Sequence, residues 1–219
     1  MQLDIYADVT CPWCYIGKRR LERALATAAA TQAGLPEIHV QWRPFLLNPG
    51  MPPGGMDRKA YLAWKFGGTG RVGFISDRIA QEGRDDGIPF AFEKIARTPS
   101  TVDAHRIIAF AQERGDAGPL VEALFAAYFT AGRDIGDRRE LIAIGGECGL
   151  DTAELSAYLE SDAGRGAIIE SNDQARSLGI NAVPCFVFDG REALAGAQPP
   201  EVFLRLFEFA RRQLPVDGH

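Results

Sequence analysis

The spacing of apolar positions near the N-terminus predicts a strand, a helix and a second strand. Residues 3–9 form a short, mostly apolar run, and residues 38–42 alternate apolar and polar side chains, so both are expected to be strands. Between them apolar residues recur at helical spacing, at Leu21, Ala24, Leu25 and Ala28. Gly34 and Pro36 are expected to end this helix. The order is typical of the start of a parallel crossover unit.

A long helical block is predicted in the middle of the chain. A loop rich in proline and glycine spans residues 44–55, and from there to about residue 162 the apolar spacing is helical. Three aspartates stand where helices are expected to begin, and we interpret them as N-caps: Asp57, Asp137 and Asp151. Three aromatic residues at helical spacing are expected in the core: Phe125, Tyr128 and Phe129. The charged residues of segment 71–86 are typical of a solvated helix face.

The strand pattern resumes near the C-terminus. Residues 179–183 lead into Pro184, and residues 185–188 form an apolar strand. Asp189-Gly190 predicts a two-residue hairpin turn before a returning strand at 191–194. Pro199 and Pro200 are expected to open a last helix, and the tail after Leu214 is expected to be loose. The pattern therefore predicts an α/β domain that is interrupted by an inserted all-helical domain.

Composition narrows the class of protein. The 219 residues carry a net charge of −5 and contain 46% hydrophobic and 24% charged residues, which is ordinary for a folded globular chain. No basic patch favours a nucleic acid partner, and no apolar run approaches the roughly 20 residues that span a membrane. The first residues lack the pattern of a secretory signal, so we expect a cytoplasmic protein. In a reducing compartment, its four cysteines are more typical of catalysis or metal binding than of structural disulfides.

The motif Cys11-Pro12-Trp13-Cys14 is the strongest chemical signal. A Cys-x-x-Cys pair that follows a strand and opens a helix is typical of a redox dithiol. The helix N-terminus favours negative charge, so the pKa of Cys11 is expected below the free value of about 8.5, which makes Cys11 the attacking thiolate. Cys14, one turn further on, would resolve the mixed disulfide. Pro12 suits the first helical turn, and the neutral Trp13 predicts a milder oxidant than histidine at that position.

Two other interpretations of the motif compete with redox chemistry. Cys-x-x-Cys is also zinc-ligand spacing, but the remaining cysteines are isolated in sequence, so no metal is expected. The pair could also be inert and buried, although a proline beside two buried cysteines at a helix start would be an unusual coincidence. Cys148 follows a helical stripe and is expected in the core, and His105 is expected to be a structural or surface residue.

Several blocks of the sequence together resemble the DsbA-like thioredoxin-fold family, in particular its FrnE-like branch. The blocks, in order, are 8–18 around the motif, 44–49, 61–67, 103–106, 182–184 and 196–201. The resemblance implies a thioredoxin-like domain made of residues 1–50 and 165–219, with an inserted helical domain at 51–164. It also implies a cis bond between Val183 and Pro184, packed opposite Cys11, which would leave the Val183 backbone free to pair with a substrate.

Cys185 departs from the pattern of the family, which usually has a residue without a thiol at this position. It is either an extra redox thiol beside Cys11 or a small hydrophobic residue that fills space.

Asn48 and the Val183 backbone are further candidates for substrate binding.

The sequence is compatible with three functions. The first is a dithiol oxidoreductase or isomerase that acts on disulfides of proteins or small molecules and exchanges with the cellular thiol pool. It needs no permanently bound cofactor, and glutathione is a candidate redox partner. The second is the glutathione-dependent chemistry of the related 2-hydroxychromene-2-carboxylate isomerases and kappa-class transferases. The third is a non-enzymatic binding or chaperone module. The substrate, the direction of exchange and the oligomeric state are not readable from the sequence.

Overall fold

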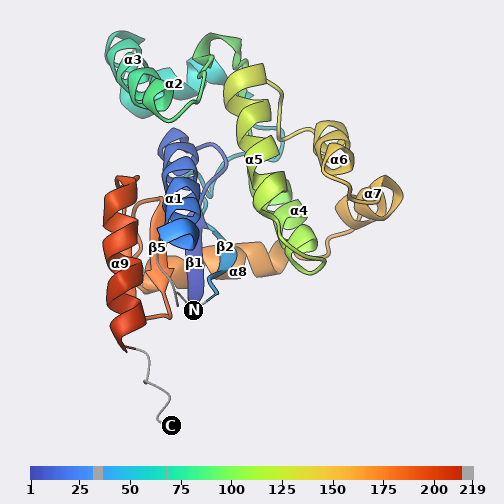
Figure 1. Cartoon of the computed structure of the whole chain (residues 1–219). Coiled ribbons are helices and arrows are strands. Elements are labelled where there is room, and N and C mark those ends of the chain that lie inside the picture. Colours follow the sequence, from blue (N-terminus) through green and yellow to red (C-terminus); the bar gives the residue numbers. More distant parts are fainter. Residues whose placement is uncertain (32–36, 68, 214–219) are drawn as a thin grey trace.

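A four-stranded mixed sheet forms the centre of the α/β part (Figure 1). The computed structural model describes residues 1–31, 37–67 and 69–213. The strand order is β2-β1-β5-β6, with β1 parallel to β2 and antiparallel to β5. The strands are β1 (Gln2–Ala7), β2 (His39–Pro44), β5 (Cys185–Phe188) and β6 (Glu192–Ala195). The crossover from β1 through the first helix to β2 is the parallel unit that the sequence predicts.

The remaining elements are mostly helical. The helices are α1 (Pro12–Thr31), α2 (Arg58–Phe66), α3 (Thr69–Asp85), α4 (Val102–Gln112), α5 (Gly118–Ala126), α6 (Arg138–Glu147), α7 (Thr152–Glu160), α8 (Arg165–Ser177) and α9 (Pro200–Gln213). A short 3₁₀ helix, η1 (Phe92–Lys94), and a π-helical turn, η2 (Ala127–Ala131), complete them. The predicted N-caps Asp57, Asp137 and Asp151 are confirmed, because the side chain of each accepts from a backbone N–H of the first turn.

One face of the sheet is sealed by α1 and α9, which pack on each other. Phe186 and Phe188 of β5 point toward this side, where their rings meet Phe203 at 4.8 Å and Phe207 at 5.9 Å between centroids. Helix α8 contacts β2 and is drawn behind the sheet in Figure 1. The end of β1 is therefore shielded from solvent by these helices, and from there the chain turns into α1.

An aromatic cluster joins α1 to the helical block. The ring of Tyr15 stacks on Phe125 at 5.0 Å and lies 6.4 Å from Phe129. The three aromatic residues that the sequence places in the core, Phe125, Tyr128 and Phe129, are all fully buried, so this prediction is confirmed. Burial of such large side chains stabilises a fold by about 1.5–3 kcal/mol each, which fixes α1 against α5.

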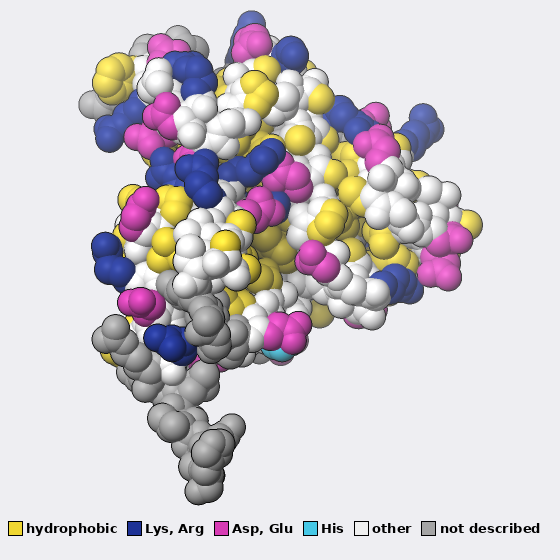
Figure 2. All heavy atoms as spheres, viewed as in Figure 1, with side chains coloured by type: hydrophobic (Ala, Val, Ile, Leu, Met, Phe, Trp, Pro, Cys, Tyr) yellow, Lys and Arg dark blue, Asp and Glu magenta, His cyan; other side chains and the backbone are white. Residues whose placement is uncertain are grey.

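Ion pairs also tie α1 to the helical block. Basic and acidic side chains gather on the surface where the two parts meet (Figure 2). Arg20 pairs with Asp86 at 2.6 Å and with Glu82 at 2.8 Å, and Lys18 pairs with Glu122 of α5 at 2.8 Å. Asp86 is 6% exposed. The sequence prediction of a solvated face for residues 71–86 is therefore wrong at this position, because the carboxylate packs against α1.

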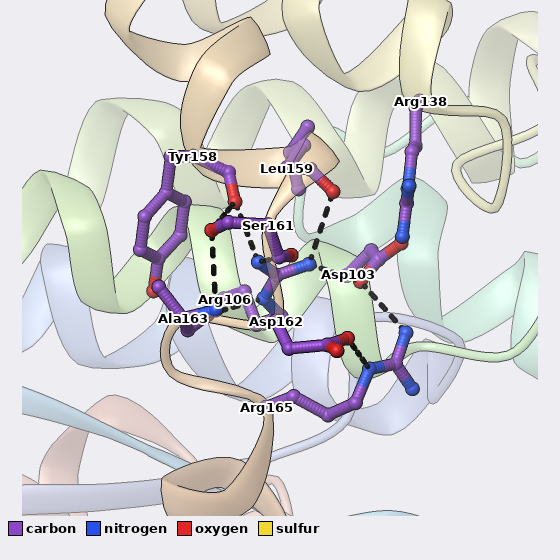
Figure 3. Close-up of polar contacts among 9 residues, drawn as sticks. All are labelled: Asp103, Arg106, Arg138, Tyr158, Leu159, Ser161, Asp162, Ala163 and Arg165. Atoms are coloured by element: carbon purple, nitrogen blue, oxygen red, sulfur yellow. Dashed lines mark hydrogen bonds and ion pairs between the residues drawn. The ribbon is translucent and has the colours of Figure 1, made fainter.

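Arg106 of α4 is fully buried and organises the end of α7 (Figure 3). It pairs with Asp103 at 2.8 Å, and Asp103 also pairs with Arg138 and Arg165 on the surface side. The guanidinium donates to four backbone carbonyls, those of Tyr158, Leu159, Ser161 and Ala163. Two of these carbonyls lie in the last turn of α7 and two lie between α7 and α8, so one side chain satisfies acceptors that a helix end leaves without intrahelical partners.

Two local predictions differ from the structure. The hairpin between β5 and β6 has a three-residue loop, since Phe188 pairs with Glu192, and the expected two-residue turn is wrong. The inserted block is not purely helical, because β3 (Met56–Asp57) and β4 (Arg97–Thr98) form a short antiparallel pair. The predicted helix end at Gly34 and Pro36 and the predicted loose tail lie outside the described residues.

Candidate active site

The motif opens α1 directly after β1. Pro12 is the first residue of the helix, where its missing N–H costs nothing. The carbonyl of Cys11 accepts from the backbone N–H of Cys14 at 3.0 Å and of Tyr15 at 3.4 Å, so Cys11 stands at the N-terminal boundary of the helix. The free N–H groups and the dipole of a 20-residue helix are thereby directed at the Cys11 side of the motif.

The segment before β5 faces Cys11 from the other half of the chain. The Sγ atom of Cys11 lies 3.7 Å from the carbonyl oxygen of Val183. The Val183–Pro184 peptide bond is cis, and Pro184 packs against α1. The structure thus brings together three of the predicted site residues, Cys11, Val183 and Pro184, from positions 172 residues apart.

Cys14 is the more enclosed of the two motif thiols, with 2% exposure against 6% for Cys11. Burial raises the pKa of the Cys14 thiol well above its usual value, and its hydrogen bond with Cys11 raises it further. All four cysteines are free thiols in the structure. Trp13 is half-buried and packs against the hydrophobic core, so its indole ring is held in place by its neighbours.

Asp8 joins the three segments that surround the motif. It is 1% exposed, and one oxygen accepts from the backbone N–H of Thr10 at 2.9 Å and from its hydroxyl at 2.8 Å. The other oxygen accepts from the backbone N–H of Leu47 at 2.8 Å and faces the Thr101 hydroxyl at 3.4 Å. Sequence reasoning missed this residue. A charged side chain immediately after a buried strand, three residues before a reactive cysteine, is the signal that could have found it.

We expect Asp8→Asn to destabilise the protein by about 2 kcal/mol, since an amide has one acceptor oxygen and would leave a buried N–H unpaired at Thr10 or Leu47. Urea unfolding of the reduced protein measures the change. Asp4→Asn is the control, because Asp4 pairs with the exposed Arg43 and its loss is expected to cost below about 1 kcal/mol. Equal, small losses in both variants would contradict a structural role for Asp8.

His105 is buried and lies beside the Asp8 network rather than at the sulfurs. Burial lowers its pKa, while the Asp8 charge and a hydrogen bond with the Phe45 backbone oppose this shift. Its Nε2 atom has no hydrogen-bond partner among the described residues. The ring lines a cavity of about 20 Å³, which can hold one water at most. This placement in the packed interior agrees with the prediction of a structural histidine.

Asn48 lies in a small polar network with two residues of a cleft that reaches the neighbours of Cys11. Its Oδ1 atom accepts from the Tyr61 hydroxyl at 2.9 Å and from Lys65 at 3.1 Å, and Lys65 also donates to the Tyr61 oxygen at 2.7 Å. Tyr61 and Lys65 line a cleft that reaches Thr10 and Pro12. The acceptor oxygen of Asn48 is therefore already engaged, and its amide N–H groups are what it can offer a ligand.

Cys185 faces away from the motif. Pro184 and Phe186 both point toward α1, since a Cβ at Gly17 would lie 3.0 Å from Pro184 Cγ and 3.2 Å from the Phe186 ring. Side chains alternate along a strand, so Cys185 projects to the opposite face of the sheet, where it pairs in register with Tyr6. Burial raises its pKa. These observations favour the packing alternative over an extra redox thiol.

Gly17 is a second residue that sequence reasoning missed. A Cβ atom on Gly17 would lie 3.0 Å from Pro184, 3.2 Å from Phe186 and 3.6 Å from the backbone of Ala197. There is therefore no room for a side chain where α1 passes Pro184. A glycine inside an otherwise regular helix costs roughly 1 kcal/mol relative to alanine, and this cost is the signal that a close approach requires it.

Neither a metal site nor a membrane-spanning helix is found in the part of the chain that the structure describes. Within residues 1–31, 37–67 and 69–213, no group of three or more His, Cys, Asp or Glu side chains is arranged to hold a metal ion. Among the helices in those ranges, none is both long and apolar enough to cross a lipid bilayer.

Fold and site define a thioredoxin-fold protein with a cysteine pair at a helix start and a helical insertion. The chain belongs to the family described as DSBA-like thioredoxin domain, whose model matches residues 2–208. A crystal structure of a probable DsbA oxidoreductase from Streptomyces coelicolor is similar over 100% of this chain and 94% of its own, with a TM-score of 0.86 and 29% identity. The uncharacterized protein YwbO of Bacillus subtilis is 26% identical over 93% of this chain and 94% of its own length.

More distant structures share the fold. The cytosolic disulfide reductase DsbM from Pseudomonas aeruginosa, solved with GSH, matches 97% of this chain and 100% of its own with a TM-score of 0.65 and 22% identity. A 2-hydroxychromene-2-carboxylate isomerase matches 97% of this chain and 96% of its own with a TM-score of 0.66 and 16% identity. At these levels of identity the two structures show a shared fold.

Proposed function

We propose that this protein is a thiol–disulfide oxidoreductase that uses Cys11 and Cys14 as a redox dithiol in a reducing, cytoplasmic environment. The observation that carries the proposal is the position of the Cys11 sulfur, at the start of α1 and 3.7 Å from the Val183 carbonyl. A thiolate there is favoured by the helix N-terminus, and a substrate chain or peptide-like ligand can pair with the Val183 backbone beside it.

The reaction follows from the unequal burial of the two thiols. The Cys11 thiolate attacks one sulfur of a disulfide substrate, the substrate S–S bond breaks, and one thiol leaves. Cys14 then loses its proton and attacks the Cys11 sulfur, which releases the second thiol and closes the Cys11–Cys14 bond. The substrate gains two electrons and two protons, and the dithiol loses them. Because burial raises the pKa of Cys14, the second step is expected to accelerate as pH rises.

Glutathione-dependent isomerase or transferase chemistry is the second candidate, favoured by the position of Asn48 near the motif and by a fold relative solved with GSH. That chemistry needs no second cysteine, so activity that survives Cys14→Ser would favour it. In the dithiol mechanism glutathione is a soluble redox partner and not a resident cofactor. A pure binding or chaperone module, the third candidate, would keep its binding after Cys11 and Cys14 are both replaced by alanine.

A redox titration in glutathione buffers tests the proposal. The protein is equilibrated over a range of ratios of reduced to oxidised glutathione, quenched with acid, and mapped by mass spectrometry at every cysteine. We expect one two-electron transition that joins Cys11 to Cys14, while Cys148 and Cys185 stay free. A protein whose motif cysteines never join at any ratio is not a dithiol oxidoreductase.

A further inference from the structure

A cleft beside the motif is formed by the helical insertion and by the two neighbours of Cys11 in the chain. Helices α2 and α3 lie over the end of α1 at which the motif stands (Figure 1). Thr10 and Pro12 line the cleft together with Leu47 and with residues of α2, α3 and η1. We call this space the α2–α3 cleft. The backbone of Cys11 therefore stands between two residues of the cleft wall, and a group bonded to its sulfur is held beside the cleft.

The charge of the α2–α3 cleft is positive. Arg58 and Lys65 line it, and no carboxylate lies in its lining within the part of the chain that the structure describes. Both cations are held by neutral partners: Lys65 donates to Asn48 and Tyr61, and Arg58 donates to the Thr98 hydroxyl at 3.2 Å. Two positive charges without a neutralising partner in the wall favour an anionic ligand group.

Another part of the lining is apolar and partly open to solvent. It includes Phe66 and Ile75, which are 42% and 41% exposed, together with the buried Ile79. Exposed apolar side chains that gather at one site are typical of a binding surface. A ligand group that covers them would gain hydrophobic stabilisation in addition to the charge interaction.

The volume of the cleft limits the size of the group. It measures about 140 Å³, close to the roughly 150 Å³ of an apolar cavity that binds benzene and well below the roughly 300 Å³ at which sites for drug-sized ligands begin. One aromatic ring or a short branched chain fits, with its acid group at Lys65 or Arg58.

We propose, on the basis of the oxidoreductase function above, that the α2–α3 cleft selects small-molecule disulfides that carry a carboxylate on an aromatic or apolar arm. The arm occupies the cleft while its sulfur exchanges with Cys11 by the two-electron reaction already described. The cleft is thereby a specificity site separate from the Val183 backbone.

Second-order rate constants of the reduced protein with three disulfides test this assignment. The probes are 5,5′-dithiobis(2-nitrobenzoate), which is aromatic and anionic, 2,2′-dithiodipyridine, which is aromatic and neutral, and glutathione disulfide, which is anionic without an apolar arm. We expect Lys65→Glu to slow the nitrobenzoate reaction by about tenfold and to change the dipyridine reaction by less than about twofold, because only the first ligand carries a charge. Phe66→Ala is expected to slow both aromatic disulfides and to leave glutathione disulfide unchanged.

Lys59→Glu is the matched control, since Lys59 is an exposed residue of the same helix and does not line the cleft. If Lys59→Glu slows the nitrobenzoate reaction as much as Lys65→Glu does, only the overall charge matters and the assignment is overturned. It is also overturned if Lys65→Glu slows the charged and the neutral aromatic disulfide equally. Failure of the underlying function looks different, because the wild-type protein would then react with dipyridine without closing the Cys11–Cys14 bond.

Discussion

Replacement of Cys11 by serine is expected to reduce disulfide exchange by about a thousandfold or more, because the hydroxyl cannot replace the attacking thiolate. Cys14→Ser is expected to behave differently. Its Cys11 still attacks, but the second step is missing, so the variant should accumulate a mixed disulfide with the substrate at Cys11.

The measurement is the reduction of glutathione disulfide by the reduced protein, followed by mass spectrometry of the quenched mixture. Cys148→Ser and Cys185→Ala are the controls, since Cys185 faces the opposite side of the sheet and Cys148 lies at the end of α6. Both controls should retain the wild-type rate within about twofold, because neither thiol takes part in the exchange. Exchange that persists in Cys11→Ser and stops in Cys185→Ala would place the chemistry at another sulfur.

Arg106→Met is expected to destabilise the protein by about 3–5 kcal/mol. The methionine keeps much of the bulk, but four backbone carbonyls in the last turn of α7 and just beyond it lose a donor, and Asp103 loses a fully buried partner. The free energy of unfolding in urea measures the loss. Because the partners of Arg106 are Asp103 and backbone groups of residues 158–163, and not residues of the motif, the folded variant should keep its exchange chemistry.

Arg165→Gln serves as the matched control for this prediction. Arg165 pairs with the same Asp103 carboxylate at 3.4 Å, but its side chain is 35% exposed, so the expected loss is below about 1 kcal/mol. A loss of less than 1 kcal/mol for Arg106→Met as well would show that the carbonyls find water instead of remaining unpaired.

Local signals in the sequence were sufficient for the order of elements and for the motif. The helical placement of Pro12, the three aspartate N-caps and the buried aromatic residues each follow from spacing within one turn or two. The same holds for Pro200 at the start of α9. Such features depend on neighbours in the chain, which a single sequence shows directly.

Features that depend on distant partners were not readable. Asp86 was expected in solvent because the segment that it ends looks polar, and only the docking of α1 brings Arg20 to it. Cys185 was a candidate redox thiol because it follows Pro184, and only the register of β5 against β1 shows that it points the other way. The role of Arg106 requires carbonyls more than 50 residues away. The division into residues 1–50, 51–164 and 165–219 stays a prediction.

The candidate active site was predicted only in part, again because some of its contacts join segments that are distant in the chain. The sequence identifies the reactive pair, and the family resemblance implies the neighbourhood of Val183 and Pro184. Asp8 and Gly17 were missed because their roles lie in contacts with Leu47 and Pro184, respectively, on segments that the sequence does not place. The α2–α3 cleft likewise forms only when the insertion folds over the start of α1.

Competitive alkylation of the four cysteines at pH 7 tests the central claim most directly, that Cys11 is an activated nucleophile. The reduced protein is treated with a limiting amount of iodoacetamide, and mass spectrometry gives the rate at each site. Exposure alone would make the half-exposed Cys148 the fastest, since Cys11 is only 6% exposed. We expect Cys11 to be labelled first, at least about tenfold faster than Cys148, because its thiolate is stabilised at the helix N-terminus. Labelling of Cys148 ahead of Cys11 would contradict the account.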